Sequence, residues 1–279
     1  MISQYLRAYI KDCYPRLYAK ITGEYTFARI SDRPSTKPSS ASNIPKKVYQ
    51  TWEYNILGST HYKQIEKFRD LNPEFDFIFF DSKQRDEYME ECYANHPISK
   101  VYKSGLFGPL KADIWRYCIL CERGGAYFDI DAWCRVPLRS LFSDSTHALI
   151  SFENNITPHL PSAEVAKLLD FPHNNILNWT LFYEKGHPFL QKVIENIVDY
   201  YPFFRRQIFD SPKDGIVKFT GPLMLTKSIH QALEKDPEIP FEQAGIDLNG
   251  LGEINMKGDW VRLAQAAHYS AFFQEAIVD

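Results

Sequence analysis

Cysteine is scarce in this sequence, and long apolar runs are missing from it. The 279 residues include an odd set of five cysteines, Cys13, Cys92, Cys118, Cys121 and Cys134. Such a set argues against a disulfide framework and fits a reducing compartment. The sequence contains no run of about 18 apolar residues that would indicate a membrane helix, and its start does not have the pattern of a secretory signal. We therefore expect a cytoplasmic protein.

An excess of positive charge is also lacking, because 32 Lys and Arg face 35 Asp and Glu. Without a global positive field, no nucleic acid partner is expected. Residues 1–30 are a local exception, with five basic side chains against two acidic ones. Their apolar residues at 5, 6, 9 and 10 recur at helical spacing. This predicts either a packed helix or peripheral contact with anionic lipid on the inner face of a membrane.

The apolar content is high enough for one sizeable core, since 44% of the residues are hydrophobic and 15% aromatic. Residues 1–43 are expected to form a basic arm followed by a linker, because 31–43 are rich in Ser, Pro and Asn. The main domain is expected to span 44–279. Its tail, 245–279, contains four glycines and is expected to be partly mobile and to close over a ligand.

Strand and helix patterns alternate along the main domain. Strands are expected at 47–52, 75–81, 126–134 and 216–222, and helices at 62–68, 83–94, 111–123 and from 188 onward. Pro109 fits the first turn of the third helix, and Gly124 with Gly125 permits a left-handed stop after it. This order predicts an α/β sandwich with a largely parallel central sheet.

The most informative triplet is Asp129-Ile130-Asp131, in the strand expected at 126–134. Because a strand has period two, both carboxylates are expected on one side, with Ile130 on the other. Two carboxylates in one small volume repel each other unless a cation lies between them. Their hard oxygen ligands suit Mg²⁺ or Mn²⁺ bound to a diphosphate. Alone, however, a D-x-D triplet is common.

The helix before this triplet carries Asp113 and Arg116 three residues apart, hence on one face. An acid suited to hydroxyl groups and a fixed cation suited to phosphate together fit a nucleotide sugar. The alternative is an ordinary pair on the surface of a helix.

Four segments carry a resemblance to a known family. They are IPKKVYQTW at 44–52, KADIWRYCILCERGGAYFDIDAW at 111–133, ILNWTLFYEKGHPF at 176–189 and KFTGP at 218–222. On these segments, the chain resembles the family-32-type DXD-motif sugar transferases over roughly residues 44–225. That family shares the GT-A fold with the glucosyltransferase domains of the large clostridial toxins.

The resemblance implies roles for five residues around the donor. Trp52 would stack on the nucleotide base. Asp113 and Arg116 would bind ribose or sugar hydroxyls and the sugar-phosphate portion. Tyr127 would lie beside the donor phosphates, and Asn178 would reach the donor sugar.

The resemblance also implies a metal site. Asp131 would be the direct ligand, and Asp129 would contact ribose, sugar or the metal shell. His268, from the tail, would supply a third ligand, which favours Mn²⁺ over Mg²⁺; the alternative is a packed histidine in an apolar segment. Trp179 departs from the toxin branch, which has a polar residue there.

The function implied is that of a retaining, metal-dependent hexosyltransferase. It would move a sugar from a nucleoside diphosphate donor, with a UDP-sugar favoured, to a hydroxyl of a glycan or glycolipid, as in bacterial surface polysaccharide synthesis. The alternatives are a phosphatase or phosphotransferase with an Asp nucleophile, and a non-catalytic module that binds nucleotide sugars. Cys118-x-x-Cys121 lies inside an expected helix and is interpreted as structural.

Overall fold

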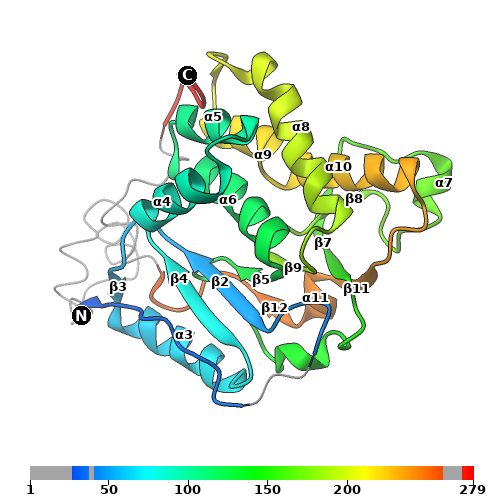
Figure 1. Ribbon diagram of the computed structural model, residues 1–279. Coiled ribbons are helices and arrows are strands. Elements are labelled where there is room, and N and C mark those ends of the chain that lie inside the picture. The colour runs from blue at the N-terminus through cyan, green and yellow to red at the C-terminus, as the bar shows by residue number, and fades with distance from the viewer. Residues whose placement is uncertain (1–26, 38–40, 260–271) are drawn as a thin grey trace, which may run out of the picture.

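The computed structural model describes residues 27–37, 41–259 and 272–279, and these form an α/β sandwich around a mixed sheet of seven strands (Figure 1). Six strands follow one another across the sheet, and the seventh pairs with the second of them. Their order is β11 (Glu242–Ile246), β7 (Ala148–Ile156), β9 (Thr180–Tyr183), β5 (Gly125–Phe128), β2 (Lys47–Thr51) and β4 (Asp76–Phe80), with β8 (Asn174–Ile176) beside β7.

Most strands run in one direction. β2 is parallel to β4 and β5, and β11 is parallel to β7, whereas β9 is antiparallel to both β5 and β7. β8 is also antiparallel to β7. The carboxyl ends of five strands therefore meet at one edge, which is where α/β sheets place their ligands. The predicted fold class is confirmed.

The helices cover the two faces of the sheet unequally. One face packs against α3 (Ser59–Leu71), which lies below the sheet in Figure 1. The helices on the other face are α4 (Ser82–Tyr93), α5 (Pro97–Ser104), α6 (Gly108–Arg123), α8 (Pro188–Phe204), α9 (Pro212–Phe219) and α10 (Pro222–Lys235). The smaller elements are η1 (Leu138–Ser140), α7 (Ala163–Ala166), α11 (Asp247–Gly250), β1 (Phe27–Ala28), β3 (Leu57–Gly58), β6 (Trp133–Cys134), β10 (Ile208–Phe209), β12 (Gly252–Glu253) and β13 (Glu275–Ala276).

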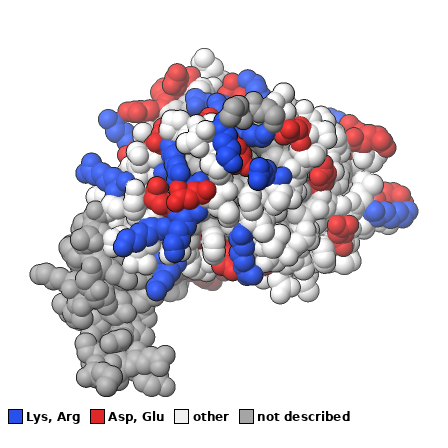
Figure 2. All heavy atoms as spheres, turned by 90° about the horizontal axis from the view of Figure 1, so that it is seen from below, with Lys and Arg blue, Asp and Glu red and all other residues white. Residues whose placement is uncertain are grey.

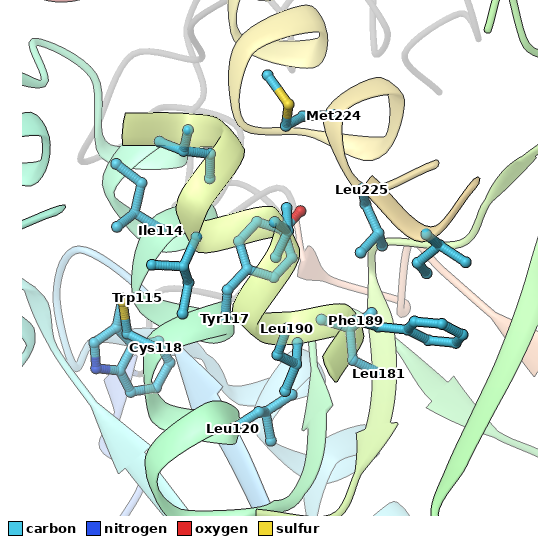
Figure 3. Packing of buried hydrophobic residues seen from close by; sticks show 14 of the residues in the cluster. Ile114, Trp115, Tyr117, Cys118, Leu120, Leu181, Phe189, Leu190, Met224 and Leu225 are labelled. Carbon is cyan, nitrogen blue, oxygen red and sulfur yellow. The ribbon is translucent and has the colours of Figure 1, made fainter. Parts of the chain in front are cut away.

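A hydrophobic core lies on each face because the strands alternate. Tyr49 and Tyr127 point into the core beneath α6, whereas Val48 and Phe128 point into the core that contains α3. Figure 3 shows the first core, where the buried face of α6 meets α8, β9 and α10. This packing holds α6 firmly on the sheet.

The turn from α6 into β5 depends on two glycines, as predicted. Gly124 has a φ of +64° and Gly125 a φ of +113°, a region that favours glycine. A Cβ on Gly125 would also come within 2.8 Å of the Lys47 carbonyl oxygen. The tight turn brings the end of β5 back beneath the inner face of α6.

Two predicted strands are wrong in detail. Residues 216–222 are not a strand but the junction of α9 and α10 around Thr220, because Pro212 and Pro222 each occupy a first helical turn. The strand expected at 126–134 ends at Phe128. Ala132 N then donates to Asp129 O over 2.9 Å, which closes a turn.

The first part of the expected linker is packed on the domain. Arg33 and Phe77 exchange two backbone hydrogen bonds of 2.9 Å, and Phe79 N donates to Asp32 Oδ1 over 3.0 Å. Ile30 is buried. Residues 31–37 are mostly exposed, as expected of a linker, but these bonds attach them to the outer edge of β4, which the sequence does not predict. The division of the chain at residue 44 stays a prediction.

Charged side chains of both signs share the face seen from below in Figure 2, where Lys and Arg gather with Asp and Glu among them. Arg33 Nη2 lies 2.7 Å from Asp70 Oδ1 on α3, and Lys46 Nζ lies 3.4 Å from Asp144 Oδ1. Among the residues that the structure describes, no helix has the length and apolarity needed to cross a membrane.

Candidate active site

The D-x-D triplet lies in the turn after β5, at the carboxyl edge of the sheet. The Ile130 carbonyl oxygen lies 2.9 Å from Nε2 of the buried His61, and Met256 N donates to Asp131 O over 3.0 Å. Hydrogen bonds from α3 and from the tail therefore hold this turn in place. The two aspartates belong to a fixed turn and not to a regular strand.

The tail segment 252–259 packs against the same turn. β12 pairs with β6, the short strand just after the triplet. A Cβ on Gly258 would lie 2.9 Å from Thr60 Cβ and 3.0 Å from His61 N, so this part of the tail sits tightly on the start of α3. His268, the predicted third metal ligand, lies outside the described residues.

Arg116 joins most of the predicted site residues. Its Nη2 lies 3.2 Å from Asp113 Oδ1 and 3.1 Å from Asp129 Oδ1, and its Nη1 donates to Asn178 O over 2.7 Å. The guanidinium carbon lies 4.3 Å from the centroid of the Tyr127 ring, and the Tyr127 hydroxyl donates to Asp129 Oδ1 over 2.6 Å. The predicted pairing of Asp113 with Arg116 on one helix face is present.

A second layer of bonds fixes Asp113, which is 5% exposed. Thr220 Oγ1 donates to its Oδ2 over 2.9 Å, and Asn178 Nδ2 donates to its Oδ1 over 3.2 Å. The Tyr117 hydroxyl lies 2.9 Å from Asn178 Oδ1 and 2.8 Å from Thr220 O. The carboxylate of Asp113 is thus held on three sides inside the protein.

The sequence does not predict Thr220 and Tyr117 as site residues. The KFTGP segment gave a signal for Thr220, but the expected strand there hid its position between two helices. Tyr117 gave none, because it has the spacing of an ordinary core residue on α6.

The electrostatics of the site centre on two acids. Burial raises the pKa of Asp129 to about 6, a rise that Arg116 opposes and Asp131 increases. Burial likewise raises the pKa of Asp113, against the effect of Arg116. Burial also disfavours the charge of Arg116, but Asp129, Tyr127 and Asp113 together raise its pKa above the usual value. The arginine is therefore the cation that holds both acids.

Asp129 and Asp131 fit a hard divalent cation. Both offer carboxylate oxygens from a fixed turn, and the Asp129 side chain is 33% exposed at the sheet edge. The mutual repulsion that raises the pKa of Asp129 is the repulsion that a cation relieves. Among the described residues there is no group of three His, Cys, Asp or Glu side chains placed to hold a metal.

The remaining predicted residues lie around this centre. Trp52 follows β2 at the same edge, with its N donating to Phe80 O over 3.3 Å, and its partly buried ring packs on the core beside α3. Tyr127 and Asn178 are buried against Arg116, so their contacts with a donor, like those of Asp113, stay predictions. Trp179 O accepts from Asp129 N over 2.8 Å.

Cys118 and Cys121 do not form a second site. Cys118 is fully buried in the core of Figure 3, and burial raises the pKa of both thiols. A thiol kept protonated is neither a good nucleophile nor a good metal ligand.

Residues 58–154 match a family model described as a glycosyltransferase sugar-binding region containing a DXD motif. This stretch contains α6, the Gly-Gly turn and the D-x-D triplet. The predicted resemblance to DXD-motif transferases is confirmed over these residues.

Several curated fungal proteins are similar to the chain. It is 27% identical over 221 residues to an initiation-specific alpha-1,6-mannosyltransferase of Candida albicans, covering 70% of this chain and 56% of that protein. It is 28% identical over 190 residues to inositol phosphoceramide mannosyltransferase 3 of Schizosaccharomyces pombe, covering 67% of this chain and 45% of that protein. The chain thus spans about half the length of these relatives.

Among solved structures, the PaToxG glycosyltransferase is similar with a TM-score of 0.49 and 14% identity, over 84% of this chain and 81% of that one. The family match and the relatives support the predicted enzyme class, a glycosyltransferase.

Proposed function

We propose that this chain, whose residues 58–154 match the glycosyltransferase region with a DXD motif, transfers a hexose from a nucleoside diphosphate to a hydroxyl of a glycan or glycolipid. One observation carries the proposal. The D-x-D turn, fixed at the carboxyl edge of the sheet, is joined by Arg116 to the Asp113 network within the matched region. The names of the relatives make mannose the first sugar to test.

Asp131 and Asp129 would hold a divalent cation, Mn²⁺ or Mg²⁺. When bound, the cation neutralises the diphosphate that leaves in the transfer. The requirement for this metal and the choice of ion are part of the proposal.

The chain's own residues position the reaction. Arg116 stabilises the charged form of Asp129 and fixes its direction, and Tyr127 adds a hydrogen bond to the same oxygen. Asp113 in turn fixes Arg116, because Thr220 and Asn178 hold the carboxylate in place. Such preorganisation matters because small displacements of reacting groups are costly in rate.

Trp52 would supply the platform for the nucleotide base. It follows β2, which lies beside β5, the strand that comes just before the triplet. A base stacked there would direct its diphosphate along the edge toward Asp129. Several finer points stay predictions. For the reaction, these are retention of anomeric configuration, a UDP-sugar donor and a third metal ligand at His268. For the cellular context, they are membrane contact through residues 1–30 and a cytoplasmic site in bacterial polysaccharide synthesis.

The test is donor hydrolysis in the absence of an acceptor. The full chain is incubated with a panel of UDP- and GDP-linked hexoses, mannose included, with Mn²⁺, with Mg²⁺ or with EDTA. We expect free hexose and nucleoside diphosphate from at least one donor, with turnover lost in EDTA. Cleavage at the anomeric carbon is the chemistry of a transferase.

The products separate the alternatives. Release of nucleoside monophosphate and sugar phosphate would instead indicate attack at phosphorus by a phosphatase-type enzyme. Binding of donors with no turnover, with or without glycan acceptors, would indicate a non-catalytic module. Either result would contradict the proposal.

A further inference from the structure

A second pair of acids lies at the same edge of the sheet, beyond β9 from the D-x-D turn. Glu153 is near the end of β7, and Asp247 begins α11, which follows the neighbouring strand β11 (Figure 1). Ser151, two residues before Glu153, hydrogen-bonds the turn that carries Asp247. Burial raises the pKa of Glu153, and the charge of Asp247 adds to the rise. Asn155 Nδ2 donates to Glu153 Oε2 over 3.3 Å. The donor site described above uses neither acid.

The backbone around Asp247 is fixed in an unusual conformation. Residues 247–250 have φ values between +47° and +73°, although only the last is a glycine. Asp and Asn adopt this region more readily than other non-glycine residues, so Leu248 is the position where it is least favourable. Ser151 of β7 holds the turn, because its hydroxyl donates to Gly245 O and accepts from Leu248 N, each over 2.8 Å. Asp247 is thereby presented at the end of β7.

Asn175 supplies a further polar group beside Glu153. The side-chain amide of Asn175 stabilises the charge of Glu153, and the residue is 7% exposed. Its Oδ1 is buried and has no hydrogen-bond partner among the residues that the structure describes. A buried acceptor without a donor is unfavourable, so this oxygen suits a ligand that brings its own donors. With two carboxylates beside it, the group is rich in acceptors and suits a ligand rich in hydroxyls.

Trp179 connects this group with the D-x-D turn. Its carbonyl accepts from Asp129 N, and its ring lies beside Gly252, next to the turn that begins at Asp247. A Cβ on Gly252 would lie 2.6 Å from Trp179 Cη2 and 3.2 Å from Asp247 O, so ring and turn meet at this glycine. The ring is partly exposed. An apolar ring beside a few polar groups is the usual composition of a site for a small ligand.

We propose that Glu153, Asp247 and Asn175 form the acceptor subsite, where they accept hydrogen bonds from the hydroxyls of a polyol whose ring lies against Trp179. The inference rests on the proposed function and adds the side from which the acceptor binds. The donor edge, from Trp52 to Asp129, and the acceptor edge, from Trp179 to Asp247, are then neighbours along one sheet. An acceptor hydroxyl bound there faces the sugar end of a donor held at Asp129.

The experiment separates acceptor binding from donor chemistry. Glu153→Gln and Asp247→Asn are compared with wild type in two assays, hydrolysis of the preferred nucleotide sugar alone and transfer to methyl α-mannoside as a soluble polyol. Both substitutions preserve side-chain shape, and asparagine tolerates the positive φ at residue 247. Glu164→Gln and Asp199→Asn, at exposed positions on α7 and α8, are the matched controls.

We expect each variant to lose about tenfold or more in kcat/KM for the acceptor, through KM, because hydrogen bonds to charged groups are lost. Donor hydrolysis and donor Kd should stay within about twofold of wild type, as should both controls. Wild-type acceptor efficiency in both variants would overturn the inference. A parallel fall in hydrolysis and transfer would also overturn it, because the acids would then serve the donor. Failure of wild type to hydrolyse any donor would instead refute the proposed function.

Discussion

Replacing Thr220 by valine removes one hydroxyl from the centre of the site and changes little else. Thr220 Oγ1 donates to Asp113 Oδ2 over 2.9 Å, and both residues are buried. Valine has nearly the same shape, so the substitution leaves the packing at the α9–α10 junction intact. The backbone carbonyl of residue 220, which lies 2.8 Å from the Tyr117 hydroxyl, is also kept.

The expected cost follows from the charge of the acceptor. Leaving a buried acceptor without its donor costs about 1–3 kcal/mol, and Asp113 keeps bonds from Arg116 and Asn178, so about 2 kcal/mol of unfolding free energy is expected. The loss should also reach the chemistry, since Asp113 fixes Arg116 and Arg116 fixes Asp129. A displacement of a few tenths of an ångström would lower kcat by roughly tenfold, given the hundredfold cost of about 1 Å.

The assay pairs urea unfolding with donor hydrolysis, and Thr146→Val is the matched control. Thr146 is equally buried, and its Oγ1 donates to the Glu242 carboxylate over 2.6 Å, before the amino end of β7 and away from the triplet. The control should lose stability but keep kcat, and Thr220→Ser should recover much of both quantities. Equal kcat in Thr220→Val and wild type would refute the chain of positioning from Thr220 to Asp129.

Two further predictions concern base binding and pH. Calorimetric titration of Trp52→Ala should show donor binding weakened by about 1–3 kcal/mol, as expected for a lost base–aromatic stack, and Trp52→Phe should recover part of this loss. A lower Tm with unchanged donor affinity would show a packing role instead. Burial lowers the pKa of His230 to about 4. Between about pH 6.5 and pH 4, the imidazole is therefore protonated in the unfolded chain but neutral in the folded one, so the free energy of unfolding decreases as the pH falls through this range. His230→Phe should therefore remove about 2 kcal/mol of the pH dependence of unfolding between pH 7 and 5, and an unchanged dependence would contradict the burial argument.

The sequence predicts the parts of this fold that depend on local patterns. The strands expected at 47–52 and 75–81 from their β-rich, apolar residues are β2 and β4. The stop at Gly124 and Gly125 occurs where expected because their backbone conformation is local. The pairing of Asp113 with Arg116 follows from helical spacing alone.

What the sequence does not predict depends on long-range contacts. Thr220 lies 107 residues from Asp113 in the chain, and no local pattern joins them. The pattern of 126–134 after the glycine stop predicts a strand that includes both aspartates, but contacts with His61 and Met256 hold their segment in a turn. The acids at 153 and 247 meet only because β7 and β11 are neighbours in the sheet.

In the proposed reaction, the D-x-D turn binds the diphosphate of a sugar donor through a divalent cation. The most direct measurement is the Mn²⁺ dependence of donor hydrolysis in wild type, Asp131→Asn and Asp129→Asn, with Asp199→Asn on the outer surface of α8 as the control. Each site substitution removes a ligand charge without changing side-chain volume, so we expect both site variants to fold and to lose turnover at every Mn²⁺ concentration. The control should match wild type, and wild-type turnover in both site variants would contradict the claim.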